Sequence, residues 1–475
     1  MAHIAESRRR RDGGGSEGGW FRSCLVNMLK CYNEFVRKLE QFLFYFLLFA
    51  IPFQTRKILW YQNWNFNEWQ SASIYGTDIL LLALFILWAF NRKHTKFNLG
   101  KYDYFLFAFL ALSAVSIKNS SSTLLSAYNF LKVIEFSVFY FYIKSYAVYR
   151  FNLTPSLVAI VAGGVFQAVI AIIQSLKQSS LGLSFLGESV ISPSLTGIAS
   201  FYNTAGTKII RAYGTTPHPN ILATYLFLAM FAFYSAYFYC HLYQSDKSYN
   251  PKLNLFLLIS YPLILLAFFY SFARVTLFLW FLTFTVRIPL VFLKKEFKKV
   301  FSEKANKAKL TKILVIGTIV VLVFGAFYWR DVISRSKISS NDEAVQLRVF
   351  YNKKSIESVN WFGVGNGNFV NWLMVKEPNL PPYVYQPVHN IYLLIYSENG
   401  IFAAGAFVVF LWLLVNDFVK KTKMVRFYHY SFLFVVLSFF FIGLFDHFLW
   451  TLQQGRLMFW LLCAGLTPPL WAGSK

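Results

Sequence analysis

The stretch LNLFLLISYPLILLAFFYSFARVTLFLWFLTFTVRIPLVFLKK, residues 253–295, decides the fold of this chain. It holds two apolar segments, 253–272 and 274–294, and each has the length of about 20 residues that an α-helix needs to cross a bilayer. The connection between them is very short and carries Arg274, while lysines begin where the second segment ends. The stretch therefore predicts two membrane-spanning helices joined by a tight turn.

The composition of the whole chain is also that of a membrane protein. Of its 475 residues, 56% are hydrophobic, 20% are aromatic and only 14% are charged, whereas soluble proteins carry about 25% charged residues. Aromatic side chains in this number suit lipid-facing helices and their interfacial belts. Four cysteines are too few to hold a secreted disulfide scaffold of this length, and the apolar content excludes an intrinsically disordered chain.

Twelve segments of the chain are apolar and long enough, or nearly so, to span a membrane. They are 40–54, 74–91, 103–118, 127–148, 155–175, 219–240, 253–272, 274–294, 311–328, 389–418, 429–446 and 452–470. The tenth segment is long, and Gly400 and Gly405 within it predict a bend or close packing against neighbouring helices. The predicted fold class is therefore an all-α integral membrane protein with about twelve transmembrane helices.

The distribution of positive charge predicts the orientation of these spans. A net charge of +25 indicates binding either to nucleic acid or to an anionic membrane, and the hydropathy favours the membrane. Every second connection is rich in Lys and Arg, most of all the segment 294–312, and cytoplasmic loops carry such an excess. Both termini are therefore predicted to be cytoplasmic. The segments 176–218 and 329–388 are then large outer loops, and the second, between spans nine and ten, is predicted to be partly helical.

Residues 1–39 are predicted to lie on the cytoplasmic side, before the polytopic membrane domain 40–470. The start of the chain is basic and has no hydrophobic core like that of a cleavable signal peptide. Residues 20–39 combine apolar and basic side chains in a pattern that is typical of an amphipathic helix on the inner leaflet. This part of the chain is therefore predicted to be a basic tail followed by an interfacial helix.

Polar residues from distant segments are predicted to meet at the outer face. They are Arg211, Arg274, Arg348, His389 and the pair Asp446–His447. Each has a structural explanation when taken alone: an arginine can anchor a helix end at the headgroups, a histidine can cap a helix, and Asp446 can pair with His447. Arg274 fits the anchor explanation least, because it lies in a tight turn between two apolar spans. Their joint position on one face favours a functional site.

Three arginines and a histidine at one face suit a reaction of a lipid diphosphate. Arginine binds phosphate oxygens through two parallel hydrogen bonds and stays charged at biological pH, so it can stabilise a departing diphosphate. A histidine can accept the proton of an attacking hydroxyl. The outer face has few carboxylates and no Asp-x-Asp pair in its first loop, so the sequence predicts neither a metal ion nor another cofactor.

Four segments, in this order, resemble the O-antigen ligase and polymerase superfamily of bacterial multi-pass membrane proteins. They are RAYGTTPHPNILATYL at 211–226, SFARVTLFLW at 271–280, LRVFYNKKSIESVNWFGVGNGNF at 347–369 and HNIYLLIYSENG at 389–400. The last is the most specific, with a His-Asn-x-Tyr helix start and a Glu-x-Gly downstream. The resemblance covers most of residues 40–470 and implies an architecture similar to that of C-type glycosyltransferases.

The resemblance implies an enzyme that transfers a glycan from an undecaprenyl diphosphate carrier to an acceptor hydroxyl. The transfer would take place at the outer face of the cytoplasmic membrane, without metal or nucleotide. On this chain, the resemblance implies that Arg211, Arg274 and Arg348 bind the diphosphate and that His389 is the catalytic base.

Other polar residues of the matching segments have expected places near this site. Glu398 fits an acidic position of the family, but nine residues of helix separate it from His389 by about half a turn, so we expect it to be buried and structural. His218 either lines the site or begins span six together with Pro219, and the helix start is favoured. The pair Asp446–His447 falls outside the matching segments and is expected to line the outer face.

The superfamily contains three activities that differ in their acceptor. Ligases attach a glycan to lipid A core, polymerases extend a carrier-linked glycan, and oligosaccharyltransferases glycosylate Ser or Thr of proteins. The single large outer loop and the compact order of the motifs favour a ligase-type transferase that uses lipid A core or another surface acceptor. A transporter or flippase of a lipid-linked glycan is a more distant alternative. It would require polar residues at the bilayer midplane, where spans five to seven are almost wholly apolar.

We predict that single cysteines introduced at positions 300 and 340 are labelled differently in intact cells. Position 300 lies in the lysine-rich connection and position 340 in the outer loop 329–388, so a membrane-impermeant maleimide should label only the second. Labelling after permeabilisation controls for the reactivity of each thiol. Labelling at 300 together with protection at 340 would reverse the predicted orientation of the whole chain.

Overall fold

The computed structural model describes residues 15–62, 66–91, 94–242, 250–293, 304–336, 343–358, 360–421 and 427–467. These residues are mainly helical, and the strands among them form two short antiparallel hairpins. Within these ranges, six helices are long and apolar enough to cross a membrane, and three shorter helices are apolar as well. The chain is therefore a helical protein with several helices suited to a membrane.

Each of the twelve predicted spans overlaps a helix. In chain order these are α1 (Gly15–Ala50), α2 (Gly76–Phe90), α3 (Lys101–Ser116), α4 (Thr123–Tyr142), α6 (Leu153–Lys177), α7 (Pro219–Leu242), α8 (Pro251–Tyr270), α9 (Arg274–Leu293), α11 (Lys304–Ser336), α14 (Ile391–Lys421), α15 (Phe427–Ile442) and α17 (Gln453–Gly465). Of these, α1, α3 and α17 are not among the nine apolar helices counted above. A helix makes its backbone hydrogen bonds within one segment, which is why apolar runs of this length fold in this way. The tight turn predicted between α8 and α9 is confirmed.

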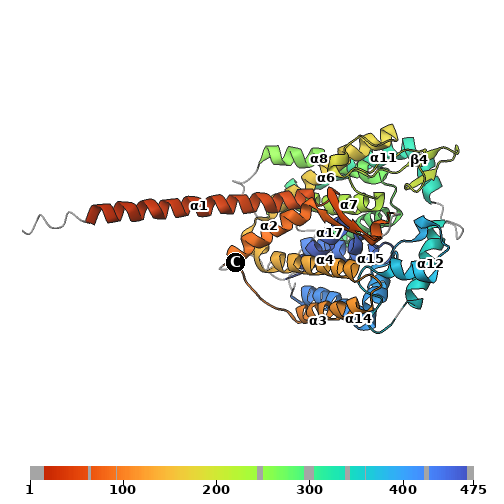
Figure 1. The fold of residues 1–475 in the computed structure, drawn as a ribbon. Helices are drawn as coiled ribbons and strands as arrows, with labels where there is room; N and C mark the ends of the chain where they lie inside the picture. The colour runs from red at the N-terminus through yellow and green to blue at the C-terminus, as the bar shows by residue number, and fades with distance from the viewer. Residues whose placement is uncertain are drawn as a thin grey trace, which may run out of the picture.

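The first helix, α1, is one continuous element of 36 residues. The boundary predicted between the interfacial helix 20–39 and the span 40–54 is not a break, because residues 20–50 contain neither proline nor glycine. The helix ends at Ala50 rather than at residue 54, and Pro52 follows. Figure 1 shows α1 projecting from one side of the helical bundle.

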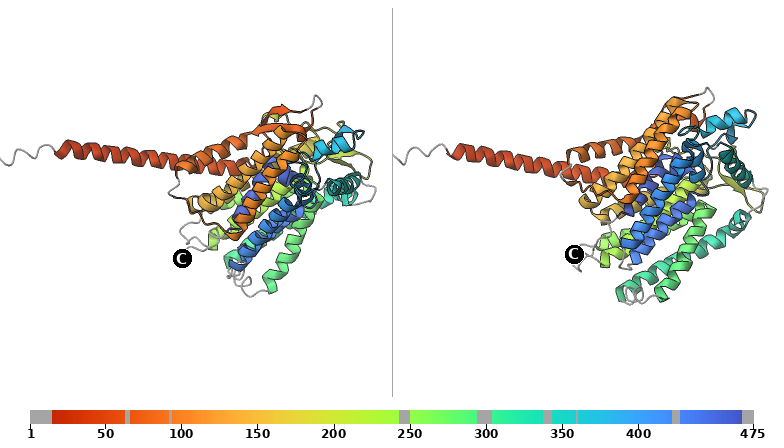
Figure 2. Two further views of the ribbon diagram at one scale, coloured as in Figure 1. Left: turned by 60° about the horizontal axis from the view of Figure 1, so that its bottom comes forward. Right: turned by 90° about the horizontal axis from the view of Figure 1, so that it is seen from below.

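The large connection between spans nine and ten begins as helix. α11 extends beyond the predicted span 311–328 at both ends, with a kink at Tyr328, where φ is −118°. The connection then contains α12 (Glu343–Glu357) and α13 (Phe369–Lys376) among its described residues. α12 gathers with the second hairpin at the end of the bundle opposite to the side from which α1 projects (Figures 1 and 2).

Two hairpins in the predicted outer connections were not anticipated from the sequence. β1 (Arg56–Tyr61) pairs with β2 (Ser71–Tyr75), and β3 (Ser200–Tyr202) pairs with β4 (Lys208–Ile210). The first hairpin joins α1 to α2, and its register shifts between Ile58 and Trp60. Strands this short have too few residues to give a clear alternation of apolar and polar side chains.

The core of the bundle centres on α7. In the most apolar stretch of α7, 89% of the residues are buried, against 17% in the corresponding stretch of α11. α7 is therefore enclosed by other helices, and α11 is peripheral. Gly163 and Gly164 on α6 allow close packing around it: a Cβ atom at Gly163 would lie 2.3 Å from the Tyr225 hydroxyl, and one at Gly164 would lie 2.7 Å from Cβ of Ala229. Small residues of this kind let membrane helices approach closely.

The bend predicted in span ten is confirmed at Gly400, where φ is 84°. The glycine-rich segment 363–369 packs at this break: the Val364 amide donates to the Ser397 carbonyl and the Gly365 amide to the Glu398 carbonyl, both at 2.9 Å. These carbonyls lack their usual helical partners because the helix changes direction. The fourth and third segments of the family resemblance are therefore bound to each other through their backbones.

Candidate functional site

His389 lies just before the first turn of α14. The Asn390 side chain accepts a hydrogen bond from the Tyr392 amide at 2.9 Å, so Asn390 caps the helix and His389 precedes the cap. The Ile391 amide donates to the Gly443 carbonyl at 2.8 Å, which ties this helix start to the end of α15. The His-Asn-x-Tyr motif thus holds a histidine against the turn that follows α15.

That turn, which leads into α16 (Phe448–Thr451), carries Asp446 and His447. Nδ1 of His389 lies 3.6 Å from Oδ1 of Asp446, and the ring centroids of His389 and His447 are 4.8 Å apart. The His389 side chain is 20% exposed, whereas Asp446 and His447 are buried. His389 is therefore the member of this group that a substrate can reach.

A polar chain leads from His389 to Arg211 through side chains that are distant in sequence. The Asn220 amide group donates to Oδ2 of Asp446 at 2.9 Å, and its oxygen accepts a hydrogen bond from Arg211 at 2.6 Å. Nε of Arg211 donates to the Ser271 carbonyl at 2.7 Å, in the tight turn before α9. The polar chain, His389–Asp446–Asn220–Arg211, therefore connects three segments of the fold: the start of α14, the turn after α15 and the segment 211–220.

Arg211 belongs to a cluster of arginines. Burial, and after it the positive charges of Arg335 and Arg274, lower the pKa of Arg211 to about 9. Arg211 is only 4% exposed, and its bond to Ser271 holds the turn from which Arg274 begins α9. Arg274 and Arg335 are half-buried and so more accessible than Arg211. The sequence did not single out Arg335, because only the extension of α11 beyond residue 328 brings it here.

Arg348 lies on the histidine side of the site. From α12, its Nε donates to the Phe445 carbonyl at 3.2 Å, next to Asp446. Its positive charge contributes to lowering the pKa of His218 and of His447. The structure thus brings all three predicted arginines to one end of the bundle, with two in the arginine cluster and Arg348 beside the histidines.

His218 begins α7 and is a neutral imidazole. Its Nδ1 accepts a hydrogen bond from the Asn220 amide at 3.2 Å, in agreement with the predicted role at the helix start. Burial, and then the charge of Arg211, lowers the pKa of His218 to about 3, and burial followed by His389 does the same for His447.

Glu398 lies apart from this group. It is 6% exposed on α14 and accepts a hydrogen bond from the Phe369 amide at 3.4 Å. The carboxylate thus faces the glycine-rich segment rather than His389, as the half-turn separation along the helix requires.

His389, Asp446 and His447 also have the donor atoms of a metal site. Among the described residues, they form the one group whose potential ligand atoms all lie within 4.8 Å of one another. Two imidazoles and a carboxylate suit a transition metal. The sequence predicted that these three residues share one face, but it did not indicate a metal site, because no ligand spacing marks them. That the protein works without metal stays a prediction.

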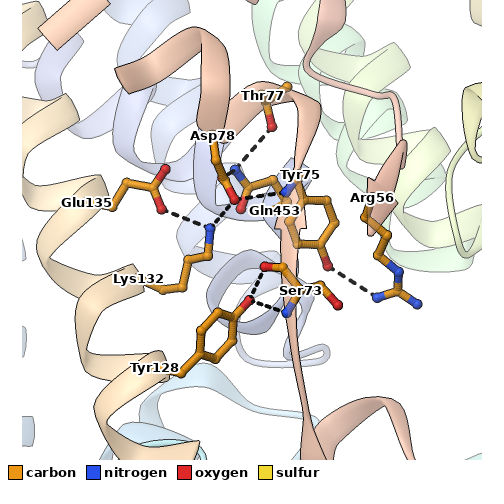
Figure 3. Close-up of polar contacts among 9 residues, drawn as sticks. All are labelled: Arg56, Ser73, Tyr75, Thr77, Asp78, Tyr128, Lys132, Glu135 and Gln453. Carbon is orange, nitrogen blue, oxygen red and sulfur yellow. Dashed lines mark hydrogen bonds and ion pairs between the residues drawn. The ribbon is translucent and has the colours of Figure 1, made fainter. Parts of the chain in front are cut away.

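A second polar cluster lies below the first hairpin (Figure 3). Lys132 on α4 forms ion pairs with Asp78 at 2.5 Å and with Glu135 at 2.9 Å, and Gln453 on α17 also donates to Asp78. The Tyr75 amide donates to Asp78 at 2.9 Å. The cluster fastens β2, α2, α4 and α17 to one another. Charged residues inside predicted spans two and four were the signal for it, but their partners were not evident from spacing.

A comparison of the chain with protein-family models and with curated proteins finds no match. Functional inference therefore rests on the geometry of the site and on the sequence motifs that build it.

We predict that Asn220→Ala lowers stability far more than Asn254→Ala. Asn220 bonds to both charged ends of the polar chain, and losing hydrogen bonds to buried charged groups costs on the order of 3 kcal/mol. Asn254 is a half-buried control on α8 whose side chain has no hydrogen bond to a described residue. Thermal unfolding of the purified proteins in detergent measures the difference. Equal melting temperatures for the two variants would contradict a stabilising role for Asn220.

Proposed function

We propose that this protein is a membrane-bound glycosyltransferase that moves a glycan from an undecaprenyl diphosphate carrier to an acceptor hydroxyl. The observation that carries the proposal is the polar chain, which links an accessible histidine to the arginine cluster. A proton acceptor and an anion-binding group are thereby held at one end of the bundle. The segments that resemble the O-antigen ligase superfamily supply this histidine and three of the arginines.

In the proposed reaction, His389 accepts the proton of the acceptor hydroxyl while the hydroxyl oxygen attacks the anomeric carbon of the glycan. The bond between that carbon and the diphosphate oxygen breaks, and the diphosphate leaves with the electron pair. Asp446, 3.6 Å from Nδ1 of His389, stabilises the imidazolium that forms. Arg274, Arg335 and Arg348 offset the growing charge of the leaving group, while buried Arg211 positions Arg274.

The proposal includes twelve membrane spans, cytoplasmic termini and a reaction at the outer side of the cytoplasmic membrane. The overlap of the twelve predicted spans with helices supports it. Arg348 on α12 contacts the site, and α12 and β4 occupy the end of the bundle opposite to the projecting α1 (Figure 1). The basic connection 294–312 would then face the anionic inner leaflet.

An assay with three acceptors tests the activity and its acceptor class. The purified protein in nanodiscs is given a glycan on undecaprenyl diphosphate together with lipid A core, a second carrier-linked glycan or a serine-containing peptide. Mass spectrometry then identifies the product. We expect transfer to lipid A core, as for a ligase. Transfer to none of the three would contradict the proposed activity, and transfer to one of the others would assign a polymerase or a protein glycosyltransferase.

We predict that Arg274→Ala and Arg348→Ala each lower turnover about 100-fold, as expected for the loss of one charged group that stabilises a leaving anion. Lysine at either position should restore little, because it cannot make the two parallel hydrogen bonds. Arg330→Ala is the matched control, since Arg330 is exposed on α11 beside Trp329. Near-normal turnover in either site variant would make that arginine an interfacial anchor.

We predict that His389→Gln removes most turnover and the acidic limb of the pH profile. A base must be neutral to accept a proton, so activity should fall as the pH drops from 8 to 5, where histidine is the side chain that ordinarily titrates. The pKa values of about 3 for His218 and His447 place the titration of these two groups below this range. EDTA should not change the rate. Inhibition by EDTA that added metal reverses would instead make His389, Asp446 and His447 metal ligands.

A further inference from the structure

A polar pocket adjoins the histidine group. It lies beneath the β1–β2 hairpin and is closed by α4, the segment 366–370 and the α16–α17 turn. Two of its lining residues contact His447: the Thr451 hydroxyl lies 2.7 Å from Nδ1, and the Trp69 ring packs edge-on at a centroid distance of 4.8 Å. A ligand in this pocket would therefore lie against Trp69 and Thr451, which contact His447, and His447 in turn contacts His389.

Arg456 gives the pocket a hydrogen-bond donor. The residue is 7% exposed, and its Nε donates to the Trp450 carbonyl at 2.5 Å. Its two terminal amino groups make no hydrogen bond with any residue in the described ranges, although the side chain lines the pocket. A buried guanidinium is costly unless its donors are used. A bound ligand would supply the missing acceptors.

The pocket is also lined by hydrogen-bond acceptors, one of which is a carboxylate. Glu398 lines the pocket, and no ion pair joins it to Arg456 within the part of the chain that the structure describes. The Asn129 oxygen accepts no hydrogen bond from a described residue, and the Ser73 hydroxyl oxygen is buried without a partner. The pocket thus offers separate donors and acceptors, as a ligand with several hydroxyl groups requires.

The charges around the pocket nearly balance. Arg56 pairs with Glu68 at 2.7 Å, and the lining contains both Arg456 and Glu398. Lys132 forms ion pairs with Asp78 and Glu135 (Figure 3). No excess positive charge remains for a phosphate or a carboxylate. This distinguishes the pocket from the arginine cluster.

Aromatic rings complete the lining. Trp69, Tyr75, Tyr128 and Trp450 all face the pocket. A pyranose ring has apolar C–H faces that pack on such rings and hydroxyl groups around its edge that need donors and acceptors. A neutral sugar therefore matches both kinds of surface, whereas a lipid chain would leave the polar groups unpaired.

We propose that this pocket, defined by Trp69, Asn129, Glu398 and Arg456, binds a neutral sugar unit of the acceptor. The assignment as an acceptor subsite rests on the proposed function, while the binding of a neutral glycan does not. The pocket adjoins His447, and the arginine cluster is linked to Asp446 through Asn220, so a sugar bound in the pocket would hold the acceptor next to the histidine group. The acceptor would then be a glycan rather than a peptide.

Binding measurements on the full chain in nanodiscs test this proposal without catalysis. The probes are free neutral oligosaccharides of hexoses and N-acetylhexosamines, uronate-containing oligosaccharides and a serine-containing peptide, each titrated by microscale thermophoresis. We expect a neutral oligosaccharide to bind, and Asn129→Ala, Trp69→Ala and Arg456→Gln each to weaken it at least tenfold. Trp361→Ala removes an exposed tryptophan that does not line the pocket and should leave binding unchanged.

Three outcomes would overturn the proposal: no neutral oligosaccharide binds, the acidic oligosaccharide or the peptide binds more tightly, or Asn129→Ala leaves binding unchanged. Asn129 is half-buried, so this variant keeps the test valid if Arg456→Gln fails to fold. Binding that depends on the pocket, without transfer in the three-acceptor assay, would contradict the glycosyltransferase and leave a glycan-binding site. Transfer that is insensitive to the pocket variants would contradict only the subsite.

Discussion

A buried cation and a buried anion that do not touch each other need a group between them that hydrogen-bonds to both. The amide of Asn220 does this, because its oxygen accepts from Arg211 and its nitrogen donates to Asp446. A direct ion pair would leave Asp446 committed to the arginine, whereas the bridge leaves its other oxygen toward His389. Asn220 stands in the first turn of α7, the most buried of the six membrane-length helices. The geometry at the end of the bundle therefore depends on the packing of its centre.

The positions of the helices were predictable because each follows from a local property, the length of an apolar run. The common location of Arg274, Arg348 and His389 was predictable for a related reason: alternating spans fix which ends share a face. Asn220 was not, since one of its two partners, Asp446, comes from a segment that only the folded bundle brings next to it. Arg335 was missed because α11 continues beyond its apolar part, and hydropathy marks only the apolar part of a helix.

The polar pocket depends on contacts that are even less local. The glycine-rich segment approaches the break in α14 so closely that a Cβ atom at Gly363 would lie 2.2 Å from the Glu398 carbonyl oxygen. Glycine at this position, where φ is 75°, allows the contact. Some motif residues that suggested a family therefore act by allowing close backbone contacts between segments. These contacts position the side chains that would take part in binding and catalysis. Neither Arg456 nor Asn129 belongs to a motif, so only the folded structure shows that they line the pocket.

The uninterrupted first helix has a mechanical consequence. A helix of 36 residues is about 54 Å long, while the hydrocarbon core of a bilayer is about 30 Å thick. Ordinary tilts of about 20° cannot take up that difference. In the proposed topology, the surplus is a rod of several turns beyond the lipid, anchored at one end in the bundle. It acts as a rigid spacer, which fixes how close to the membrane surface anything attached at its far end can come.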